Sequence, residues 1–168
     1  GSLIIERIKQ IVGSHFMSKN RILITGGSGF IGTNLIKYFL DKECDVFNLD
    51  KDKPKDLAYE KYWYKVDVCD FEKLDSIVNV IKPDYLVHLA ARTDLNEKEG
   101  IQYYNVNVIG VENIVKIIIN YPLIKRVIFA SSMLVNKVGY KAKSVFDYNP
   151  NTLYGRSKVI GEEIVFKH

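Results

Sequence analysis

Short apolar runs alternate along this chain with longer segments in which apolar residues recur every three or four positions. The short runs have the length and composition of buried strands, and they span residues 21–25, 45–49, 62–66, 85–89 and 126–130. The longer segments have helical spacing and span residues 30–40, 71–81, 101–120 and 152–167. Strands that alternate with helices in this way form right-handed crossovers and a parallel sheet buried on both faces. The pattern predicts an α/β fold.

Composition agrees with one globular domain. The chain has 168 residues, of which 47% are hydrophobic and 26% charged, and this excludes a disordered tail, a collagen-like fibre and a disulfide scaffold. No run of about 18 uncharged apolar residues occurs, so no membrane-spanning helix is expected. Cys44 and Cys69 lack C-x-x-C spacing, and reduced thiols in a cytoplasmic protein are the simplest interpretation.

The charge balance is only mildly basic. Lys and Arg number 24 against 20 Asp and Glu, a net charge of +4, without a dense basic stripe interleaved with aromatic residues. We therefore expect no nucleic-acid partner. No metal ligand set is predicted.

The N-terminal segment is unlike the rest of the chain. Gly1-Ser2 is typical of a cloning remnant, and residues 3–16 have helical apolar spacing without the features of a secretory signal. Met17 resembles a natural start. We interpret residues 1–16 as a tag or non-native extension, with a genuine extension as the alternative, and residues 17–168 as the domain.

A glycine-rich motif provides the strongest local signal. Gly26, Gly27, Gly29 and Gly32 lie between a predicted strand and a predicted helix, in the order of a G-x-G-x-x-G dinucleotide loop. Such glycines allow a tight turn and close approach to a pyrophosphate, which the free N–H groups of the helix N-terminus then bind. The alternative is a glycine-rich turn without a ligand.

Two carboxylates follow the next strands. Asp50 ends the second strand, where a carboxylate accepts the adenosine-ribose hydroxyls and repels a 2′-phosphate, so it favours NAD over NADP. Lys51 and Lys53 keep NADP open, and a solvated strand-end Asp is the alternative for Asp50. Asp67, followed by Val68, is positioned to lie near the adenine.

A second constellation lies near the C-terminus. Tyr154 and Lys158 are four residues apart, so on a helix they share one face, and a nearby cation lowers the pKa of a phenol toward that of a general base. Ser131 and Ser132 follow the fifth strand, at the sheet edge where ligands bind. These residues predict a Ser–Tyr–Lys hydride-transfer group. The alternatives are a surface Tyr–Lys pair and a serine that bonds only to backbone.

Taken together, these motifs resemble the extended short-chain dehydrogenase/reductases, specifically the NAD-dependent epimerase/dehydratase family that acts on nucleotide sugars. The matching segments are TGGSGFIG (25–32), Asp50, the VDV around Asp67, HLAAR (88–92), NVNVIGVEN (105–113), FASSM (129–133) and YGRSK (154–158). The resemblance implies a Rossmann-type doubly wound parallel sheet that binds NAD.

The resemblance also implies a role for each matching residue. Gly26, Gly29 and Gly32 would form the pyrophosphate loop, capped by the backbone of Phe30 and Ile31. On the cofactor side it adds Asp50 for the ribose, Asp67 and Val68 for the adenine, Leu89, Ala90 and Ala91 along the cleft, and Ser131. Asn107 matches a helix asparagine of the family that makes either a cofactor-side or a structural contact. Arg92 would lie at the cleft mouth near substrate, whereas His88 is expected to be a packed strand residue.

Catalysis is implied to proceed by transient oxidation of a sugar hydroxyl. Ser132 would polarise the hydroxyl or ketone, Tyr154 would transfer the proton, and Lys158 would bind the nicotinamide ribose and lower the pKa of Tyr154. The family's dehydratases carry an acidic pair where this chain has Met133 and Leu134, so the resemblance favours an epimerase. This chain has Asn136 where the family usually has Tyr, and this difference leaves the form of the substrate pocket open.

Other functions stay open. A dehydratase or sugar-ketone reductase of the same family is one alternative, and a non-enzymatic NAD-binding interaction module is another. Family members are roughly twice as long, so we expect five strands in the order 3-2-1-4-5, a missing C-terminal substrate lobe, and a fragment that binds NAD weakly at best and is inactive alone. We also expect a homodimer through the helices at 101–120 and 152–167.

Overall fold

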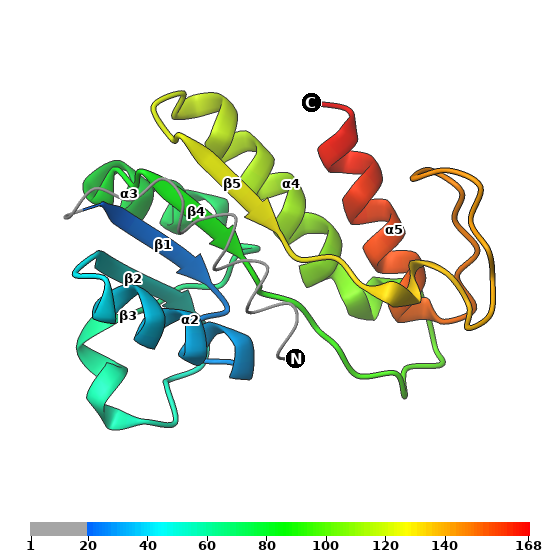
Figure 1. Cartoon of the computed structure of the whole chain (residues 1–168), viewed down its shortest axis with the longest axis horizontal. Helices are drawn as coiled ribbons and strands as arrows, with labels where there is room; N and C mark the ends of the chain where they lie inside the picture. Colours follow the sequence, from blue (N-terminus) through cyan, green and yellow to red (C-terminus); the bar gives the residue numbers. More distant parts are fainter. Residues whose placement is uncertain (1–19) are drawn as a thin grey trace.

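The computed structural model describes residues 20–168, which form a five-stranded parallel sheet with helices on both faces (Figure 1). The strand order is β3-β2-β1-β4-β5, as predicted. The extension at residues 1–16 and the start at Met17 lie outside the described residues. Among residues 20–168, no helix has the length and apolar character needed to cross a membrane.

The strands end within a residue or two of their predicted limits. They are β1 (Arg21–Thr25), β2 (Asp45–Asp50), β3 (Trp63–Lys65), β4 (Tyr85–His88) and β5 (Arg126–Phe129). The largest difference is β3, which is shorter than predicted because it is an edge strand paired only with β2, with exposed Tyr64 and Lys65. Its parallel register brings Asp50 opposite Lys65.

Two apolar cores cover the two faces of the sheet. On one face α2 (Phe30–Asp41) packs through Leu35, Ile36 and Phe39 against Ile22 and Ile24 of β1. On the other face α3 (Phe71–Ile81) and α4 (Asn105–Asn120) pack against the side chains that alternate with these along the strands, including those of Leu23, Leu49 and Leu86. The α5 helix (Leu153–Phe166) lies beside α4 (Figure 1).

The predicted helix at 101–120 is divided. A 3₁₀ turn, η2 (Ile101–Tyr104), precedes α4, and Tyr103 N donates to Gly100 O at 3.3 Å, an i→i+3 bond. Apolar spacing over one turn does not separate a 3₁₀ from an α conformation, which explains the difference. Two further 3₁₀ turns were not predicted, η1 (Leu57–Tyr62) and η3 (Met133–Val135).

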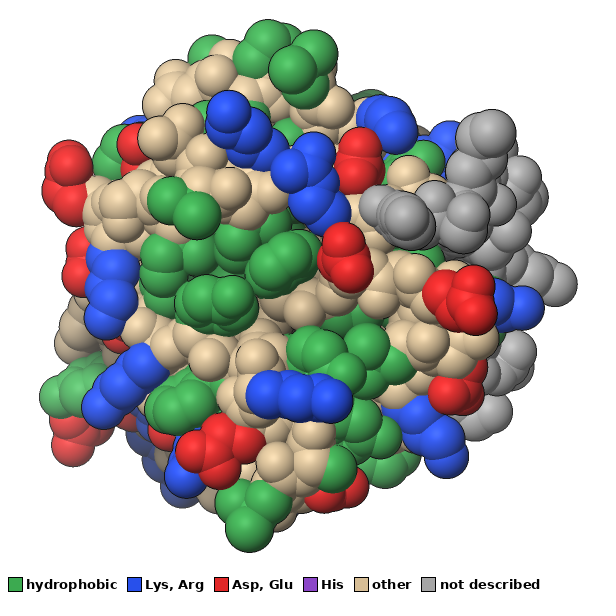
Figure 2. Space-filling view, turned by 90° about the vertical axis from the view of Figure 1, so that its left-hand side faces the viewer, with side chains coloured by type: hydrophobic (Ala, Val, Ile, Leu, Met, Phe, Trp, Pro, Cys, Tyr) green, Lys and Arg blue, Asp and Glu red, His purple; other side chains and the backbone are tan. Residues whose placement is uncertain are grey.

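Charge is mixed on the face shown in Figure 2. Basic and acidic side chains are interspersed there, with hydrophobic patches between them. On the described part of this face, side chains of one sign do not gather into a continuous stripe.

Candidate functional site

A cleft of about 880 Å³ opens at the carboxyl ends of the strands. Because β1 lies between β2 and β4, the chain reverses its winding direction there, and α/β sheets bind ligands at such a point. Most of the residues predicted from the sequence line this one cleft: Gly26, Gly29, Phe30, Ile31, Gly32, Asp50, Asp67, Val68, Leu89, Ala90, Ala91, Arg92, Ser131, Tyr154 and Lys158. Two predicted residues, Asn107 and Ser132, do not line it.

The glycine loop connects β1 to α2 in close contact with its surroundings. Gly26 has a φ of +71° and its N–H donates to Leu49 O at 2.9 Å; a Cβ there would lie 2.6 Å from Ala90 N. A Cβ on Gly32 would lie 2.4 Å from Gly27 Cα, so the helix packs directly on the loop. The cap residue of α2, Gly29, gives no side-chain cap, which leaves first-turn N–H groups available for an anion.

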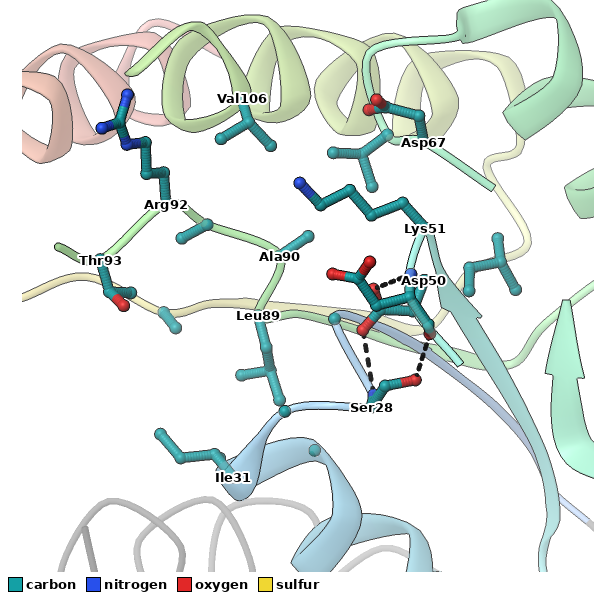
Figure 3. Close-up of a pocket in the computed structure, with 18 of the residues that line it drawn as sticks. Ser28, Ile31, Asp50, Lys51, Asp67, Leu89, Ala90, Arg92, Thr93 and Val106 are labelled. Carbon is teal, nitrogen blue, oxygen red and sulfur yellow. Dashed lines mark hydrogen bonds between the residues drawn. The ribbon is translucent and has the colours of Figure 1, made fainter. Parts of the chain in front are cut away.

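Asp50 is fixed in position at the end of β2. Its carboxylate accepts hydrogen bonds from Ser28 N and Asp52 N, both at 3.0 Å (Figure 3). Since a carboxylate offers about four lone-pair sites, acceptor capacity remains for ligand hydroxyls. Lys51 reaches into the cleft between Asp50 and Asp67 (Figure 3).

The segment after β3 closes the same end of the cleft. Asp67 Oδ1 accepts from Cys69 N at 2.9 Å, and burial together with Asp67 raises the pKa of the Cys69 thiol to about 11. Val68 O accepts from Asn113 Nδ2 of α4 at 2.9 Å. These bonds hold Asp67 and Val68 at the cleft wall. Asp70 begins α3, where its side chain accepts from Lys73 N at 3.1 Å.

Tyr154 and Lys158 share one face of α5 and both line the cleft. Thr152 begins this helix, since its hydroxyl accepts from Gly155 N at 2.9 Å. The side chain of Lys158 is 8% exposed and its Nζ donates to Ala130 O at 2.6 Å, while burial lowers the pKa of Lys158. A buried cation therefore lies one helical turn from the phenol, as the spacing predicts.

The two serines after β5 face different surroundings. Ser131 lines the cleft and its hydroxyl donates to the carboxylate of Glu162. Ser132 begins η3, and its Oγ accepts from Leu134 N at 3.1 Å. That bond uses a lone pair and leaves the hydroxyl proton of Ser132 free to donate. The structure thus brings Tyr154 and Lys158 together at the cleft and places Ser132 next to it, one residue beyond its lining.

The side chains of Arg92 and Asn107 both bond to other groups of the protein. The guanidinium of Arg92 pairs with Asp94 at 2.6 Å and Glu97 at 3.3 Å, at the opposite end of the cleft from Asp50 (Figure 3). Asn107 is 1% exposed, and its Nδ2 donates to Arg92 O and to Ser157 Oγ, both at 2.9 Å. Asn107 therefore connects the loop after β4 to α5 outside the cleft.

His88 lies in the core, as expected for a strand residue. Its Nδ1 lies 2.7 Å from Thr25 Oγ1, and its ring packs edge-on against Phe129 with centroids 5.8 Å apart. Burial, with a smaller effect of the Lys158 charge, lowers the pKa of His88 to about 3. The imidazole is therefore neutral at physiological pH.

Several cleft residues were missed by the sequence analysis: Ser28, Lys55, Thr93, Tyr103, Asn105 and Val106. Ser28 lies inside the glycine motif, which was a usable signal. Lys55 and Thr93 come from segments without periodic spacing, whereas Tyr103, Asn105 and Val106 lie within the predicted helix at 101–120, whose spacing did not show which side chains reach the cleft. Gly155 was also overlooked, although a Cβ there would lie 2.1 Å from Leu134 O and would push η3 away from α5.

The comparisons with known proteins agree with this geometry. A sequence model described as the NAD dependent epimerase/dehydratase family matches residues 22–168. The chain belongs to this family, and the fold and cleft described above are those of its Rossmann-type domain.

Individual relatives carry different activities. The chain is 38% identical over 106 residues to a GDP-6-deoxy-D-talose 4-dehydrogenase of Aggregatibacter actinomycetemcomitans, covering 62% of this chain and 32% of that protein. It is 32% identical to a dTDP-glucose 4,6-dehydratase of Haemophilus influenzae (60% and 33% covered). It is also 32% identical to a UDP-glucose 4-epimerase of Halalkalibacterium halodurans (66% and 34% covered).

Solved structures show the same fold. The UDP-Glc/GlcNAc 4-epimerase of Campylobacter jejuni superposes with a TM-score of 0.77 at 24% identity, covering 88% of this chain and 48% of that one. The Bordetella bronchiseptica enzyme WbmG, solved in complex with NAD and UDP, has a TM-score of 0.73 at 27% identity, with 89% and 50% covered. The chain thus spans about half the length of these proteins.

Proposed function

We propose that this chain supplies the NAD site and the proton-transfer residues of a nucleotide-sugar 4-epimerase. One observation carries the proposal: the glycine loop, Asp50, Tyr154 and Lys158 line the same cleft although they are spread from β1 to α5. A glycine-rich turn without a ligand does not require a carboxylate held at the end of the next strand or a buried lysine that lines the same cleft.

The cleft residues fit NAD in their chemistry. The uncapped start of α2 offers N–H donors for a pyrophosphate, and Asp50 offers free acceptor sites for ribose hydroxyls. Asp67 and Val68 would border the adenine, and Leu89, Ala90 and Ala91 would line the passage to α5. NAD, when bound, supplies the hydride acceptor for a sugar carbon.

The protein residues would then transfer the proton of the sugar 4-hydroxyl and hydrogen-bond to its oxygen. Tyr154 would accept the proton of the sugar 4-hydroxyl as hydride leaves its carbon, and Ser132 would donate its free hydroxyl proton to the same oxygen. Lys158 would favour the phenolate of Tyr154 through its charge. Return of hydride to the opposite face of the rotated ketone, with the proton returned by Tyr154, gives the epimer.

The residues after Ser132 favour epimerisation over dehydration. Met133 is 92% exposed, and neither it nor Leu134 offers an acid or base for eliminating water. Relatives include both epimerases and dehydratases, so a dehydratase or a ketone reductase is the alternative.

The cytoplasm is the proposed location, and a homodimer the proposed assembly. Four half-buried aliphatic side chains of α4 and α5 support pairing through these helices: Val108, Ile109, Ile160 and Ile164. Burial of such side chains against a second copy would remove apolar surface from water.

Assay of the product of the whole open reading frame that encodes this sequence tests the function. We expect interconversion of UDP-glucose and UDP-galactose that requires NAD and is lost in Tyr154→Phe. Formation of a 4-keto-6-deoxy sugar from dTDP-glucose would assign the dehydratase alternative. Failure to convert either substrate, or equal turnover by Tyr154→Phe, would contradict the proposed mechanism.

A further inference from the structure

Glu162 extends the row formed by Tyr154 and Lys158 by one more helical turn. Residues four apart share a helix face, so Glu162 follows Lys158 as Lys158 follows Tyr154. Its carboxylate is half-buried and accepts hydrogen bonds from two hydroxyls that come from separate segments. One is Ser131 Oγ and the other is Tyr148 OH, at 2.7 Å.

The helix therefore holds two consecutive residues at the end of β5. Lys158 Nζ donates to Ala130 O at 2.6 Å, and Glu162 accepts from the side chain of Ser131. Ser132 is the next residue, and it begins η3. Since residues 130 and 131 are both attached to α5, the position of Ser132 relative to Tyr154 depends on these two attachments.

The surroundings strengthen the electrostatic link between Glu162 and Lys158. Both line a second hollow of about 450 Å³ that includes no residue of the glycine loop. Its other lining residues are mainly apolar: Val111, Phe129, Ala130, Ser131, Val145, Gly161, Val165 and Phe166. Charges interact more strongly in such an environment than in water. Glu162 raises the pKa of Lys158 against the opposing effect of burial.

Two titratable groups near this pair are neutral at physiological pH, whereas the exposed carboxylate of Glu163 acts on Tyr148 from the outer side of the helix. Burial and the Glu162 carboxylate raise the pKa of Tyr148 to about 12, so its hydroxyl stays protonated and keeps donating. His88, from β4, is held neutral by burial, and its interaction with Lys158 disfavours its protonation further. The hydroxyl of Ser131 carries no charge. The negative charge of Glu162 is thus the one that acts on the ammonium of Lys158 and raises its pKa.

We propose that Glu162 is a positioning residue of this active site: it fixes Ser131, and through it Ser132, and its charge holds the ammonium of Lys158 in place beside Tyr154. The effect on turnover rests on the proposed function. The structural and electrostatic parts do not, because they concern only the described residues of this chain.

Titration of the Lys158 side chain tests the proposal without substrate or cofactor. The protein, labelled with ¹³C and ¹⁵N at lysine, is followed by NMR from pH 6 to 11 as wild type, Glu162→Gln and Glu163→Gln. Glu162→Gln keeps the size of the side chain and removes its charge, whereas Glu163 is exposed on the same helix and serves as the matched control. We expect the pKa of Lys158 to fall by about one unit in Glu162→Gln and to stay unchanged in Glu163→Gln.

Two further variants keep the test decisive if Glu162→Gln does not fold. Ser131→Ala and Tyr148→Phe each remove one hydroxyl from the carboxylate and leave its charge in place. The proposal expects Ser131→Ala to shift the amide resonances of residues 132–135, and Tyr148→Phe to leave them in place. Equal pKa values of Lys158 in wild type and folded Glu162→Gln, or unshifted resonances in Ser131→Ala, would overturn it. Absence of epimerase activity in the product of the whole open reading frame would instead refute the proposed function alone.

Discussion

Asn107 pairs with the backbone of Arg92 through both ends of its side-chain amide. Arg92 N donates to Asn107 Oδ1 at 2.8 Å, and Asn107 Nδ2 donates to Arg92 O at 2.9 Å. The same Nδ2 reaches Ser157 Oγ, which itself donates to Tyr154 O at 2.6 Å. A single buried amide therefore connects the loop after β4 to the first turn of α5, where Tyr154 lies.

Replacing this amide should destabilise the whole domain. Asn107→Ala leaves the N–H and C=O of Arg92 without their partners, and we expect a loss of about 2–4 kcal/mol in the free energy of unfolding. Urea denaturation measures it. Asn120→Ala, at the exposed end of the same helix, is the control and should change stability by less than about 0.5 kcal/mol. Similar stabilities for the two variants would show that the amide does not hold the loop.

Two glycines of the loop should respond differently to the same substitution. A Cβ on Gly32 would meet Gly27 Cα at 2.4 Å and Gly26 O at 2.6 Å, whereas a Cβ on Gly29 would have its nearest neighbour, Gly26 O, at 3.4 Å. Gly32→Ala should therefore lower the melting temperature by several degrees and abolish NAD binding. Gly29→Ala should leave the melting temperature unchanged, so that any loss of binding reports contact with the ligand. Calorimetry with and without NAD measures both quantities.

Stability should fall in mildly acidic solution because of His88. Its pKa is about 3 in the folded protein, against an ordinary value of 6.5, so below pH 6.5 the unfolded chain binds a proton that the folded chain does not. The stabilising contribution is complete above pH 6.5 and is lost as the pH falls toward 3. The expected slope is at most about 1.4 kcal/mol per pH unit.

Denaturant unfolding between pH 7.5 and 5 checks this slope. The range avoids Asp84, whose pKa is lowered by its backbone bond to Arg21 and by Lys125 and whose protonation matters only at lower pH. In His88→Gln the dependence over this range should flatten, whatever the variant's absolute stability. An unchanged slope in His88→Gln would mean that other groups cause the acid sensitivity.

Lys158 should matter for binding and not for stability. Burial of its ammonium costs free energy that its bond to Ala130 O and the Glu162 charge only partly offset, as its lowered pKa indicates. Lys158→Met should keep the free energy of unfolding within about 1 kcal/mol of wild type while weakening NAD binding at least tenfold. Lys167→Met, exposed just beyond the same helix, is the matched control for both measurements. Equal NAD affinity in the two variants would remove Lys158 from the site.

The sequence predicted features that depend on local spacing. Three such features are the glycine motif, Asp50 at the end of a strand and the four-residue interval from Tyr154 to Lys158. The parallel sheet followed from the alternation of elements, whereas the strand order was expected from the family resemblance. Arg92 was expected at the mouth of the cleft near substrate, and it lines the cleft. Its guanidinium pairs with Asp94 and Glu97 through a loop conformation that no periodicity encodes.

Other parts of the site depend on tertiary contacts that a single sequence does not reveal. The hydroxyl of Ser132 is directed by η3, a three-residue turn without an apolar pattern. Glu162 stands at a visible interval from Lys158, but its partners Ser131 and Tyr148 lie 31 and 14 residues away. Binding of NAD was expected to be weak at best in this chain. Because the glycine loop and Asp50 line the same cleft as Tyr154 and Lys158, we expect measurable binding of NAD.

Parallel calorimetric titration of this chain with NAD and NADP tests the central claim most directly. The claim is that the cleft binds NAD and that Asp50 makes it prefer NAD to NADP. We predict saturable binding of NAD that is at least tenfold tighter than that of NADP. In Asp50→Ala the ratio of the two affinities should fall, because the carboxylate that repels a 2′-phosphate is gone. Absence of saturable NAD binding by the folded chain, or equal affinity for the two cofactors, would contradict the account.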